Sequence, residues 1–249
     1  MPDFDDSTLW RISAYERIRR EKGSSVFATL GENTVLPTTM VAELRHLESH
    51  HEGSDVLEVL AACLRHRQSA LLCIKYQEYV WPITVFPGEG VFHSPRDLAV
   101  ASAEGLAHAK VASCEPTGLR PPGHWMRERV ARPDQYWPLK TLLWTMALMG
   151  PRDTLLNEIG GHAAYRSTLA TESRPATPGA LGPAADRLRR ETASLRDIAR
   201  WPGMSTERAS RLLNALYLAS GLMVMRTHPS ARGAPQTIAS RFGLGKPKR

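Results

Sequence analysis

The chain has 249 residues, of which 42% are hydrophobic and 23% are charged, enough for one large domain or two smaller ones with a substantial core. Its formal net charge of +7 is uneven, because residues 184–249 hold 13 Lys/Arg and 4 Asp/Glu (+9), whereas residues 1–183 hold 19 and 21 (−2). The first residues lack the basic lead and apolar run of a secretory signal, and no run approaches the roughly 18 apolar residues of a membrane span, so we expect a cytoplasmic protein without a membrane partner.

Residues 1–34 are expected to form an amino-terminal helical segment, and residues 35–166 a mixed α/β domain. In this domain, the apolar spacing of "SDVLEVLAACLRH" predicts a helix with Ser54 as its N-cap. The next stretch, "SALLCIKYQEYVWPITVFPGEGVFHS", is rich in β-branched and aromatic residues and is interrupted by Pro and Gly, which predicts consecutive short antiparallel strands. A further apolar helix is predicted in "WPLKTLLWTMALMG".

The cysteines and histidines give little indication of chemistry. The cysteines are Cys63, Cys73 and Cys114. They lie in apolar stretches without a CxxC pair, which indicates small buried core residues. His46 and His50, four residues apart and near Asp55, leave open a metal-dependent enzyme, although their polar segment favours a solvated helix end. Glycine-rich phosphate loops and a GxSxG elbow are absent from the sequence, so we expect no enzyme, catalytic residue, metal or cofactor.

Residues 167–183, "STLATESRPATPGALGP", are rich in Ser, Thr and Pro and contain only two large apolar residues. This composition is typical of a linker between domains, and a surface loop inside one domain is the alternative interpretation. The final domain is then expected to span residues 184–249. A fragment from Ala184 onward should therefore fold and carry the basic charge.

The stretch "SLRDIARWPGMSTERASRLLNALYLASGLMVMR" has the strongest local pattern in the chain. Ser194 and Asp197 are spaced as a capping box at the start of a short helix, and "WPGMS" predicts a turn. Ser205 or Thr206 can cap a second helix. Its buried stripe is predicted to comprise Ala209, Leu212, Leu213 and Leu216, and its opposite face Glu207, Arg211, Asn214 and Leu218. The apolar "LMVMR" predicts a strand, and "THPSARGAPQT" a hairpin tip or wing.

These residues resemble the winged helix-turn-helix domains of bacterial transcription regulators, so the expected fold is α+β, a mixed α/β domain followed by a carboxy-terminal winged helix-turn-helix. The resemblance implies that the second helix docks in the major groove of double-stranded DNA. It implies base contacts from Arg208, Arg211 and Asn214, phosphate contacts from Ser205 and Thr206, and wing contacts from Arg226 and Arg232. It also implies a homodimer that sets the half-site spacing.

Residues of about 54–97 also resemble small signalling domains of the PATAN type, in which a helix precedes a β-hairpin with a glycine at its turn. Gly88 or Gly90 would be that glycine, and His93 the histidine-like position that follows. The resemblance implies protein interaction instead of catalysis. Since Leu218 on the exposed helix face is better suited to a packed partner than to DNA, a non-enzymatic signalling adaptor that binds proteins through the α/β domain or the Leu218 face is the alternative function.

Overall fold

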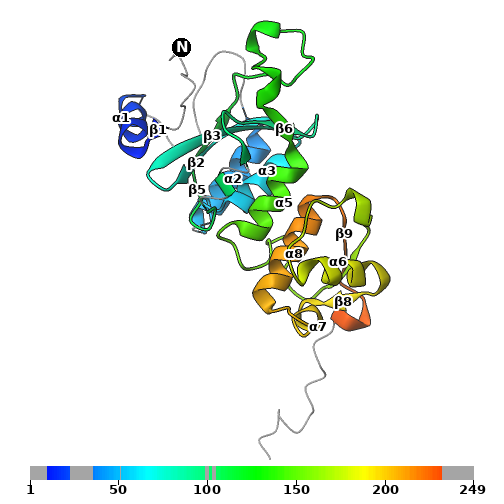
Figure 1. Ribbon diagram of the computed structural model, residues 1–249. Helices are drawn as coiled ribbons and strands as arrows, with labels where there is room; N and C mark the ends of the chain where they lie inside the picture. Colours follow the sequence, from blue (N-terminus) through cyan, green and yellow to red (C-terminus); the bar gives the residue numbers. More distant parts are fainter. Residues whose placement is uncertain (1–9, 23–35, 51, 99–100, 103–104, 232–249) are drawn as a thin grey trace, which may run out of the picture. The chain divides into compact units, whose positions relative to one another are not determined.

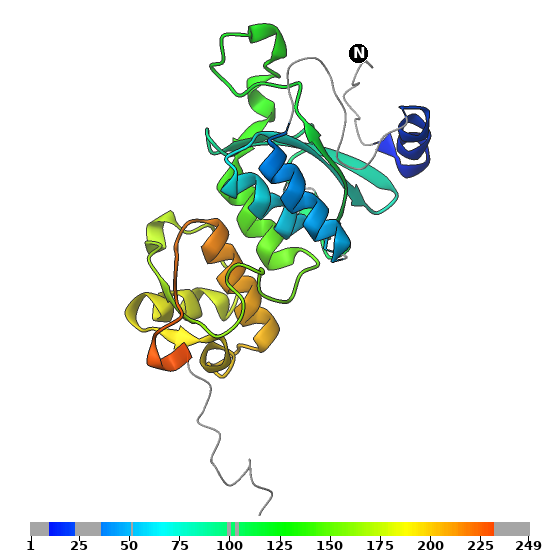
Figure 2. The ribbon, with the colours of Figure 1, turned by 180° about the vertical axis from the view of Figure 1, so that it is seen from behind.

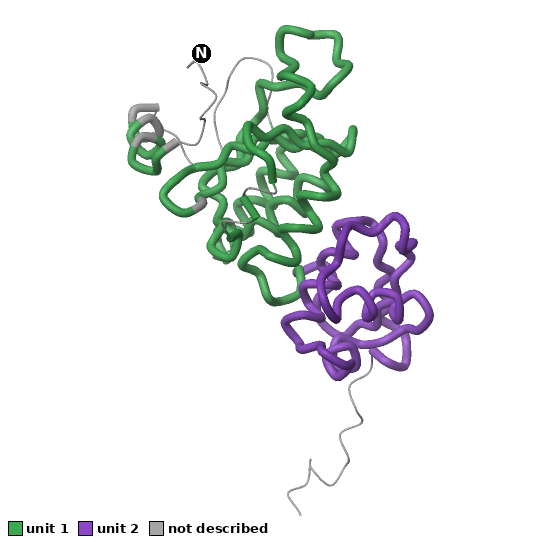
Figure 3. Tube along the Cα trace, viewed as in Figure 1, with its two compact units in different colours: residues 1–156 green, residues 157–249 purple. Residues whose placement is uncertain are grey.

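The computed structural model describes residues 10–22, 36–50, 52–98, 101–102 and 105–231. The chain forms two compact units, residues 1–156 and residues 157–249 (Figure 3). The described part of each unit contains helices and one antiparallel sheet, so the predicted α+β class is confirmed at this level. Among the described residues, no helix combines the length and the apolar character that crossing a bilayer requires.

The described part of the first unit contains four α-helices and the strands of one sheet. The helices are α1 (Ile12–Lys22), α2 (Thr38–Ser49), α3 (Val56–Arg65) and α5 (Leu139–Met149), with short 3-10 turns η1 (Arg127–Arg129) and η2 (Pro133–Gln135). The strands are β1 (Trp10–Arg11), β2 (Ala70–Tyr76), β3 (Tyr79–Phe86), β4 (Val91–His93), β5 (Lys110–Pro116) and β6 (Tyr136–Pro138). Part of the predicted amino-terminal segment, β1 and α1, therefore belongs to this unit, because β1 pairs with β3.

The sheet of the first unit runs in the order β5-β2-β3-β4-β6, with β1 also paired to β3. All of these pairs are antiparallel, which confirms the strands predicted after α3. The register of β2 and β3 aligns Tyr76 with Tyr79, so Gln77 and Glu78 form the hairpin turn between them. Gln77 has a φ of 53°, which matches the left-handed backbone of tight hairpin turns.

Helices cover both faces of this sheet. Helices α2, α3 and α5 lie together on one face (Figures 1 and 2). On the other face, Tyr15 of α1 packs against Cys73, Val80 and Ala112. Its hydroxyl group hydrogen-bonds to Ser113 of β5 at 2.7 Å, and burial raises the pKa of this phenol. The sheet is therefore the centre of the unit and is buried by apolar side chains on both sides.

The three cysteines are part of this core. They are Cys63 of α3, Cys73 of β2 and Cys114 of β5, with exposed fractions of 1%, 6% and 0%. All three are free thiols, so their predicted role as buried core residues is confirmed.

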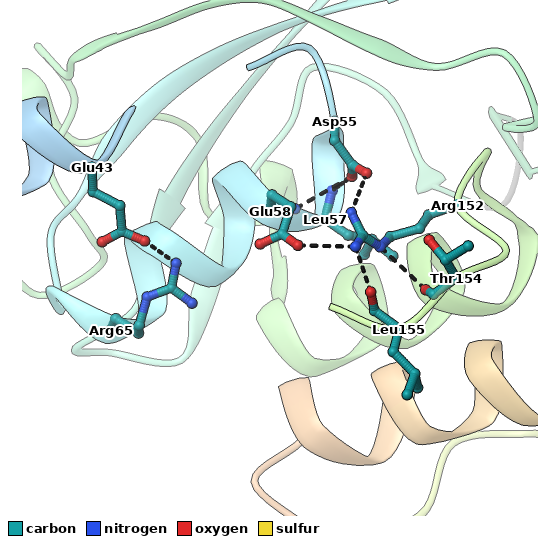
Figure 4. Close-up of polar contacts among 8 residues, drawn as sticks. All are labelled: Glu43, Asp55, Leu57, Glu58, Arg65, Arg152, Thr154 and Leu155. Atoms are coloured by element: carbon teal, nitrogen blue, oxygen red, sulfur yellow. Dashed lines mark hydrogen bonds and ion pairs between the residues drawn. The ribbon is translucent and has the colours of Figure 1, made fainter. Parts of the chain in front are cut away.

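A buried ion network fixes the end of the first unit to the start of α3 (Figure 4). The guanidinium group of Arg152 contacts Asp55 Oδ2 at 2.7 Å and Glu58 Oε1 at 3.1 Å. It also donates hydrogen bonds to the carbonyl oxygens of Thr154 and Leu155. The Asp55 carboxylate accepts from two amides of the first turn, so Asp55 is the N-cap of α3 and the prediction of Ser54 was wrong. One arginine thus joins a helix start to the segment after α5.

The second unit contains a three-stranded antiparallel sheet in the order β8-β7-β9. Its elements are β7 (Ala164–Ser167), η3 (Thr171–Ser173), α6 (Leu181–Arg190), β8 (Ala193–Ser194), α7 (Leu195–Ile198), α8 (Thr206–Leu218), β9 (Leu222–Met225) and η4 (Pro229–Ala231). The central strand, β7, pairs with β8 through Ala164 and Tyr165 and with β9 along its full length. Tyr165 is fully buried, so this strand lies in the core of the unit.

The domain boundaries differ from the prediction, because the second unit begins at residue 157 and not after a linker. Residues 167–183 follow the central strand and lead into α6. Arg174, whose side chain is 10% exposed, pairs with Asp186 of α6 at 2.9 Å, and Thr171 accepts a hydrogen bond from Arg189 at 2.7 Å. The segment is thus a surface loop inside one unit, the alternative left open above. A fragment from Ala184 onward would lack the central strand.

The structure after α8 also differs from the predicted wing. β9 pairs with β7, which precedes α6, and the described residues after β9 form η4 and no second strand. η4 packs beside β8, and its Ala231 is buried. The remainder of the predicted wing, including Arg232, lies outside the described residues. The two helices are therefore backed by a sheet whose middle strand comes from earlier in the chain.

Candidate nucleic-acid interface

The first helix of the candidate interface, α7, begins with the predicted capping box. Ser194 Oγ accepts a hydrogen bond from the Asp197 amide at 3.3 Å, and the Asp197 carboxylate accepts one from the Ser194 amide at 3.2 Å. These contacts satisfy two amide donors that a four-residue helix cannot satisfy internally. The capping box is confirmed, and it fixes where α7 starts.

The second helix, α8, starts after a tight turn. Trp201 is buried and its carbonyl oxygen accepts a hydrogen bond from the Met204 amide at 3.0 Å, which closes the turn. Ser205 is then the N-cap, since its side chain accepts from the Arg208 amide at 3.2 Å. The sequence predicted either Ser205 or Thr206 as the N-cap, and in the structure it is Ser205. The helix start is exposed to solvent from Pro202 to Arg208 except at Met204, which is half-buried.

Replacing Gly203 with Ala is expected to destabilise the second unit by about 2 kcal/mol or more, because an L-residue in the left-handed region costs about 1–2 kcal/mol before any clash. Gly203 has a φ of 72°, and a Cβ added there would lie 2.8 Å from Ala180 Cβ. Gly179→Ala is the matched control, since Gly179 has a φ of 57° but no atom within 4 Å of an added Cβ. Urea denaturation followed by circular dichroism should show the larger loss for Gly203→Ala, and equal losses would contradict the clash.

The residues predicted to contact DNA do not form one surface. Ser205, Thr206, Arg208 and Arg226 are exposed. Arg208 Nη1 donates to the Gly203 carbonyl oxygen at 2.6 Å, so its guanidinium group lies over the turn. Arg226 donates to the carbonyl oxygens of Glu158 and Gly160 at 2.8 and 2.9 Å, which fixes the segment before β7. Arg226 therefore has a structural role that the sequence did not indicate.

Three assignments on the expected outer face of α8 need correction. Asn214 is fully buried, with an exposed fraction of 0%, and Leu218 is 4% exposed, so neither can meet DNA or a partner protein as placed. The Arg211 side chain is 17% exposed and pairs with Glu207 at 3.3 Å. Beyond its first turn, α8 is buried on more than one face, because α6, α7 and β9 pack against it and the Tyr217 hydroxyl donates to the Glu158 carboxylate before β7.

Exposed arginines that the sequence analysis did not select lie on α7 and next to it. Arg196 in α7 and Arg200 just after it are exposed, and neither forms an ion pair or side-chain hydrogen bond with another described residue. Arg196 lies in the first turn of α7, and Arg200 lies two residues after its end, where its amide donates to the Asp197 carbonyl oxygen at 3.0 Å. Both arginines stand in the segment "LRDIAR", before the helix on which the DNA contacts were predicted. Arg196, Arg200 and Arg208 are named the turn arginines below.

The acidic groups near the turn arginines are already bonded elsewhere. Asp197 is held in the capping box, and Glu207 pairs with Arg211. Glu191 pairs with Arg187, whose guanidinium group lies 4.5 Å from the centroid of a Trp201 ring. A hydrogen bond from Arg174 lowers the pKa of Asp186 and outweighs burial, which raises that pKa. The positive charge of the turn arginines is therefore not neutralised by these carboxylates.

Comparison of the chain with protein-family models, with curated proteins and with solved structures finds no match.

The histidines considered for a metal site in the first unit are bonded in other ways. The rings of His46 and His50 are 4.2 Å apart between centroids, and His50 Nδ1 donates to the His46 carbonyl oxygen at 2.9 Å. Asp55 caps α3 and pairs with Arg152. No group of three or more His, Cys, Asp or Glu side chains within the described ranges could hold a metal ion.

Two other histidines have structural contacts. His66 Nε2 and Arg65 both contact the Glu43 carboxylate of α2, the former at 2.7 Å, and Figure 4 shows the Arg65 contact. Burial raises the pKa of Glu43, but these bonds outweigh it and hold that pKa below its usual value. His93 in β4 is half-buried, and burial lowers its pKa despite a 3.4 Å contact with Gln135. Both histidines therefore contribute to packing between elements.

Proposed function

We propose that the second unit binds double-stranded DNA, mainly through phosphate contacts from the turn arginines, as part of a transcription regulator. The observation that carries this proposal is the presence of three exposed arginines that flank the turn between α7 and α8 in the chain, none of which pairs with a carboxylate of the described residues, in a unit with 15 Lys/Arg and 6 Asp/Glu and thus a formal charge of +9. Phosphate neutralisation by Arg and Lys supplies most nonspecific DNA affinity.

The start of α8 adds to this positive surface. Ser205 and Thr206 are exposed at the amino end of a 13-residue helix, where the helix dipole favours anions. Arg208 lies in the same turn of the helix. A DNA phosphate beside this end would meet the dipole and the guanidinium groups together, which is how many helix-turn-helix proteins are positioned on the backbone.

We infer that base reading contributes less than the sequence suggested. Of the three residues expected at base edges, Asn214 is buried, Arg211 is paired with Glu207, and Arg208 alone is exposed. Phosphate contacts fix a protein on the duplex but carry no direct sequence information. The proposed binding is therefore strong at low salt and only weakly selective among sequences.

Salt dependence tests this proposal. The dissociation constant of the full chain for a fluorescent 20-base-pair duplex, measured by anisotropy between 50 and 300 mM NaCl, is expected to rise steeply. Three phosphate contacts alone give a slope of log affinity against log salt of about −2.7. Duplexes of unrelated sequence should give similar affinities. A slope near zero, or no binding at 50 mM NaCl, would rule out the proposal.

One of the two observations behind the alternative function, a protein-binding adaptor, is not present in the structure. It was predicted from an exposed Leu218 and from the hairpin of the first unit, and Leu218 is buried. The helix-hairpin order of α3, β2 and β3 is present, with a turn before β4 in which Gly90 has a φ of 67°. This order supports no particular partner, so DNA binding is the function we propose.

A further inference from the structure

The segment between β5 and β6 forms an arm that projects from the sheet of the first unit (Figures 1 and 2). We define the Trp125 arm as residues 120–130. Its two ends are held together, because the Arg120 amide donates to the Arg129 carbonyl oxygen at 2.9 Å and Arg120 forms a β-bridge with Val130. The Tyr136 hydroxyl donates to the Arg120 carbonyl oxygen at 2.6 Å and accepts from the Ala131 amide at 2.9 Å.

The tip of the arm has regular turn hydrogen bonds. The His124 amide donates to Pro121, the Arg127 amide to Trp125 and the Arg129 amide to Met126, over 3.0 to 3.2 Å. These bonds and the closed base give the tip a defined conformation. A side chain at the tip is therefore presented in a fixed place, which lowers the entropy lost when a partner binds.

The side chain at this tip is an indole exposed to solvent. Trp125 is 80% exposed, whereas Trp81 and Trp144 in the core are 1% and 2% exposed. The His124 ring lies beside it in a stacked arrangement, with centroids 5.6 Å apart and planes at 28°. His124 Nδ1 accepts from the Met126 amide at 3.1 Å, which fixes that ring. The arm thus presents a short aromatic surface, and the described part of the chain leaves its indole 80% exposed.

Two exposed arginines follow Trp125 within four residues of the chain. Arg127 and Arg129 are exposed, and neither side chain forms an ion pair or hydrogen bond within the described ranges. Arg132 and Asp134, just after the arm, pair with each other at 2.9 Å, which leaves Glu128 as the nearest acid in the sequence without such a partner. The partner that fits is therefore one with a flat apolar face and a negative group close to it.

The geometry points to unpaired nucleotides, in single-stranded DNA or RNA, as the ligand of the Trp125 arm. Each nucleotide carries a flat base and a phosphate within one monomer, so a base can stack on Trp125 while its phosphates meet Arg127 and Arg129. In a duplex both faces of an internal base are covered by its neighbours, whereas a single strand offers them to aromatic side chains. This site shares no residue with the surface proposed for duplex DNA, and it does not depend on that proposal.

The test uses the full chain carrying Arg196→Ala, Arg200→Ala and Arg208→Ala, so that the proposed duplex surface does not contribute. Anisotropy with fluorescein-labelled dT12 gives the dissociation constant for this parent protein. Adding Trp125→Ala is expected to weaken binding about tenfold, since one stacked base is worth that much. Trp125→Phe should keep most of the affinity, because phenylalanine also stacks.

Two further measurements separate stacking from charge. A 12-mer of abasic deoxyribose phosphate has the same charges as dT12 without bases, and it should bind the parent weakly and be indifferent to Trp125→Ala. Arg45→Ala, which removes an exposed arginine from α2, is the matched control for charge and should leave dT12 binding unchanged. Circular dichroism should show that Trp125→Ala leaves the fold intact, because the indole is exposed.

Equal affinity of the parent and Trp125→Ala for dT12, or no binding of dT12 at all, would overturn the inference. Equal binding of dT12 and the abasic strand would also overturn it, because only charge would then matter. An oligoglutamate peptide that binds as tightly as dT12 and loses affinity with Trp125→Ala would identify an acidic protein as the partner instead. Duplex binding by the unmodified chain tests the other surface, so the two proposals can fail separately.

Discussion

Replacing Arg152 with Met is expected to lower the free energy of unfolding of the first unit by about 3–5 kcal/mol, because breaking a buried ion pair leaves a charge without compensation. The Arg152 side chain is 7% exposed, and it contacts Glu58, which is 2% exposed, and Asp55, which is 20% exposed. Methionine retains much of the buried stem but none of the five donors. Two carboxylates would then remain at the start of α3 with no cation between them.

Denaturation by urea, followed through tryptophan fluorescence, measures this loss, since five of the six tryptophans lie in the first unit and only Trp201 in the second. Arg132→Ala is the control. It breaks an ion pair of similar length with Asp134, but the two side chains are 67% and 63% exposed, so the expected loss is at most about 1 kcal/mol.

A double variant separates two causes of the expected loss, the missing attraction between Arg152 and its carboxylates and the cost of a buried carboxylate without that ion pair. If the loss in Arg152→Met comes mainly from the buried Glu58 charge that has lost its ion pair with Arg152, then Arg152→Met with Glu58→Met should be more stable than Arg152→Met alone. The two methionines would replace charged groups with apolar ones of comparable volume. The free energies of unfolding of Arg152→Met, Glu58→Met and the double variant are compared. If the double variant loses as much stability as the two single variants together, the side chains do not act as one buried network.

The parts of the fold found from sequence are those fixed by contacts close in the chain. The capping box of Ser194 and Asp197 spans three residues, and the β2–β3 hairpin closes over Gln77 and Glu78. Such features depend on local spacing and turn chemistry, which are visible in the letters themselves. They predicted the start of α7 and the consecutive antiparallel strands after α3 without knowledge of tertiary packing, whereas the predicted N-cap of α3 was one residue too early.

The parts that were missed depend on contacts far apart in the chain. β7 is four residues long, and Tyr165 pairs with Val224 of β9, almost sixty residues later. No local pattern marks such a strand as the centre of a sheet. The polar composition of residues 167–183 suggested a linker for the same reason, since the pairing of Arg174 with Asp186 appears only when α6 is folded back.

The exposure of the predicted site residues also depends on contacts that are far apart in the chain. A helical wheel assigns one face to the core and leaves the other to solvent, so Asn214 and Leu218 were predicted to be exposed. Both are buried, because packing partners meet α8 from more than one direction. The start of α8 was predicted with Ser205 or Thr206 as its cap, and Ser205 is the N-cap. The exposed Trp125 was not singled out, because an aromatic residue in a loop has no distinguishing pattern.

Removing all three turn arginines, through Arg196→Ala, Arg200→Ala and Arg208→Ala, is expected to weaken duplex binding by about 10²- to 10³-fold at 50 mM NaCl. Each phosphate contact contributes about 0.9 to the salt slope of log affinity, so the slope should become shallower by about 2 to 3. The loss should be similar for unrelated sequences, because phosphates are the same in all of them. Anisotropy titrations at several salt concentrations measure both the affinity and its slope.

The controls for this variant come from the same helices and from the first unit. Arg211→Ala removes an arginine that is one turn further along α8 but already paired with Glu207, so it should weaken binding much less than Arg208→Ala. Arg45→Ala removes an equal charge from α2 and should change neither affinity nor slope. A triple variant that keeps the full affinity and the full salt slope would show that the phosphates lie against some other part of the chain. In that case the exposed turn between α7 and α8 would not be the DNA-binding surface.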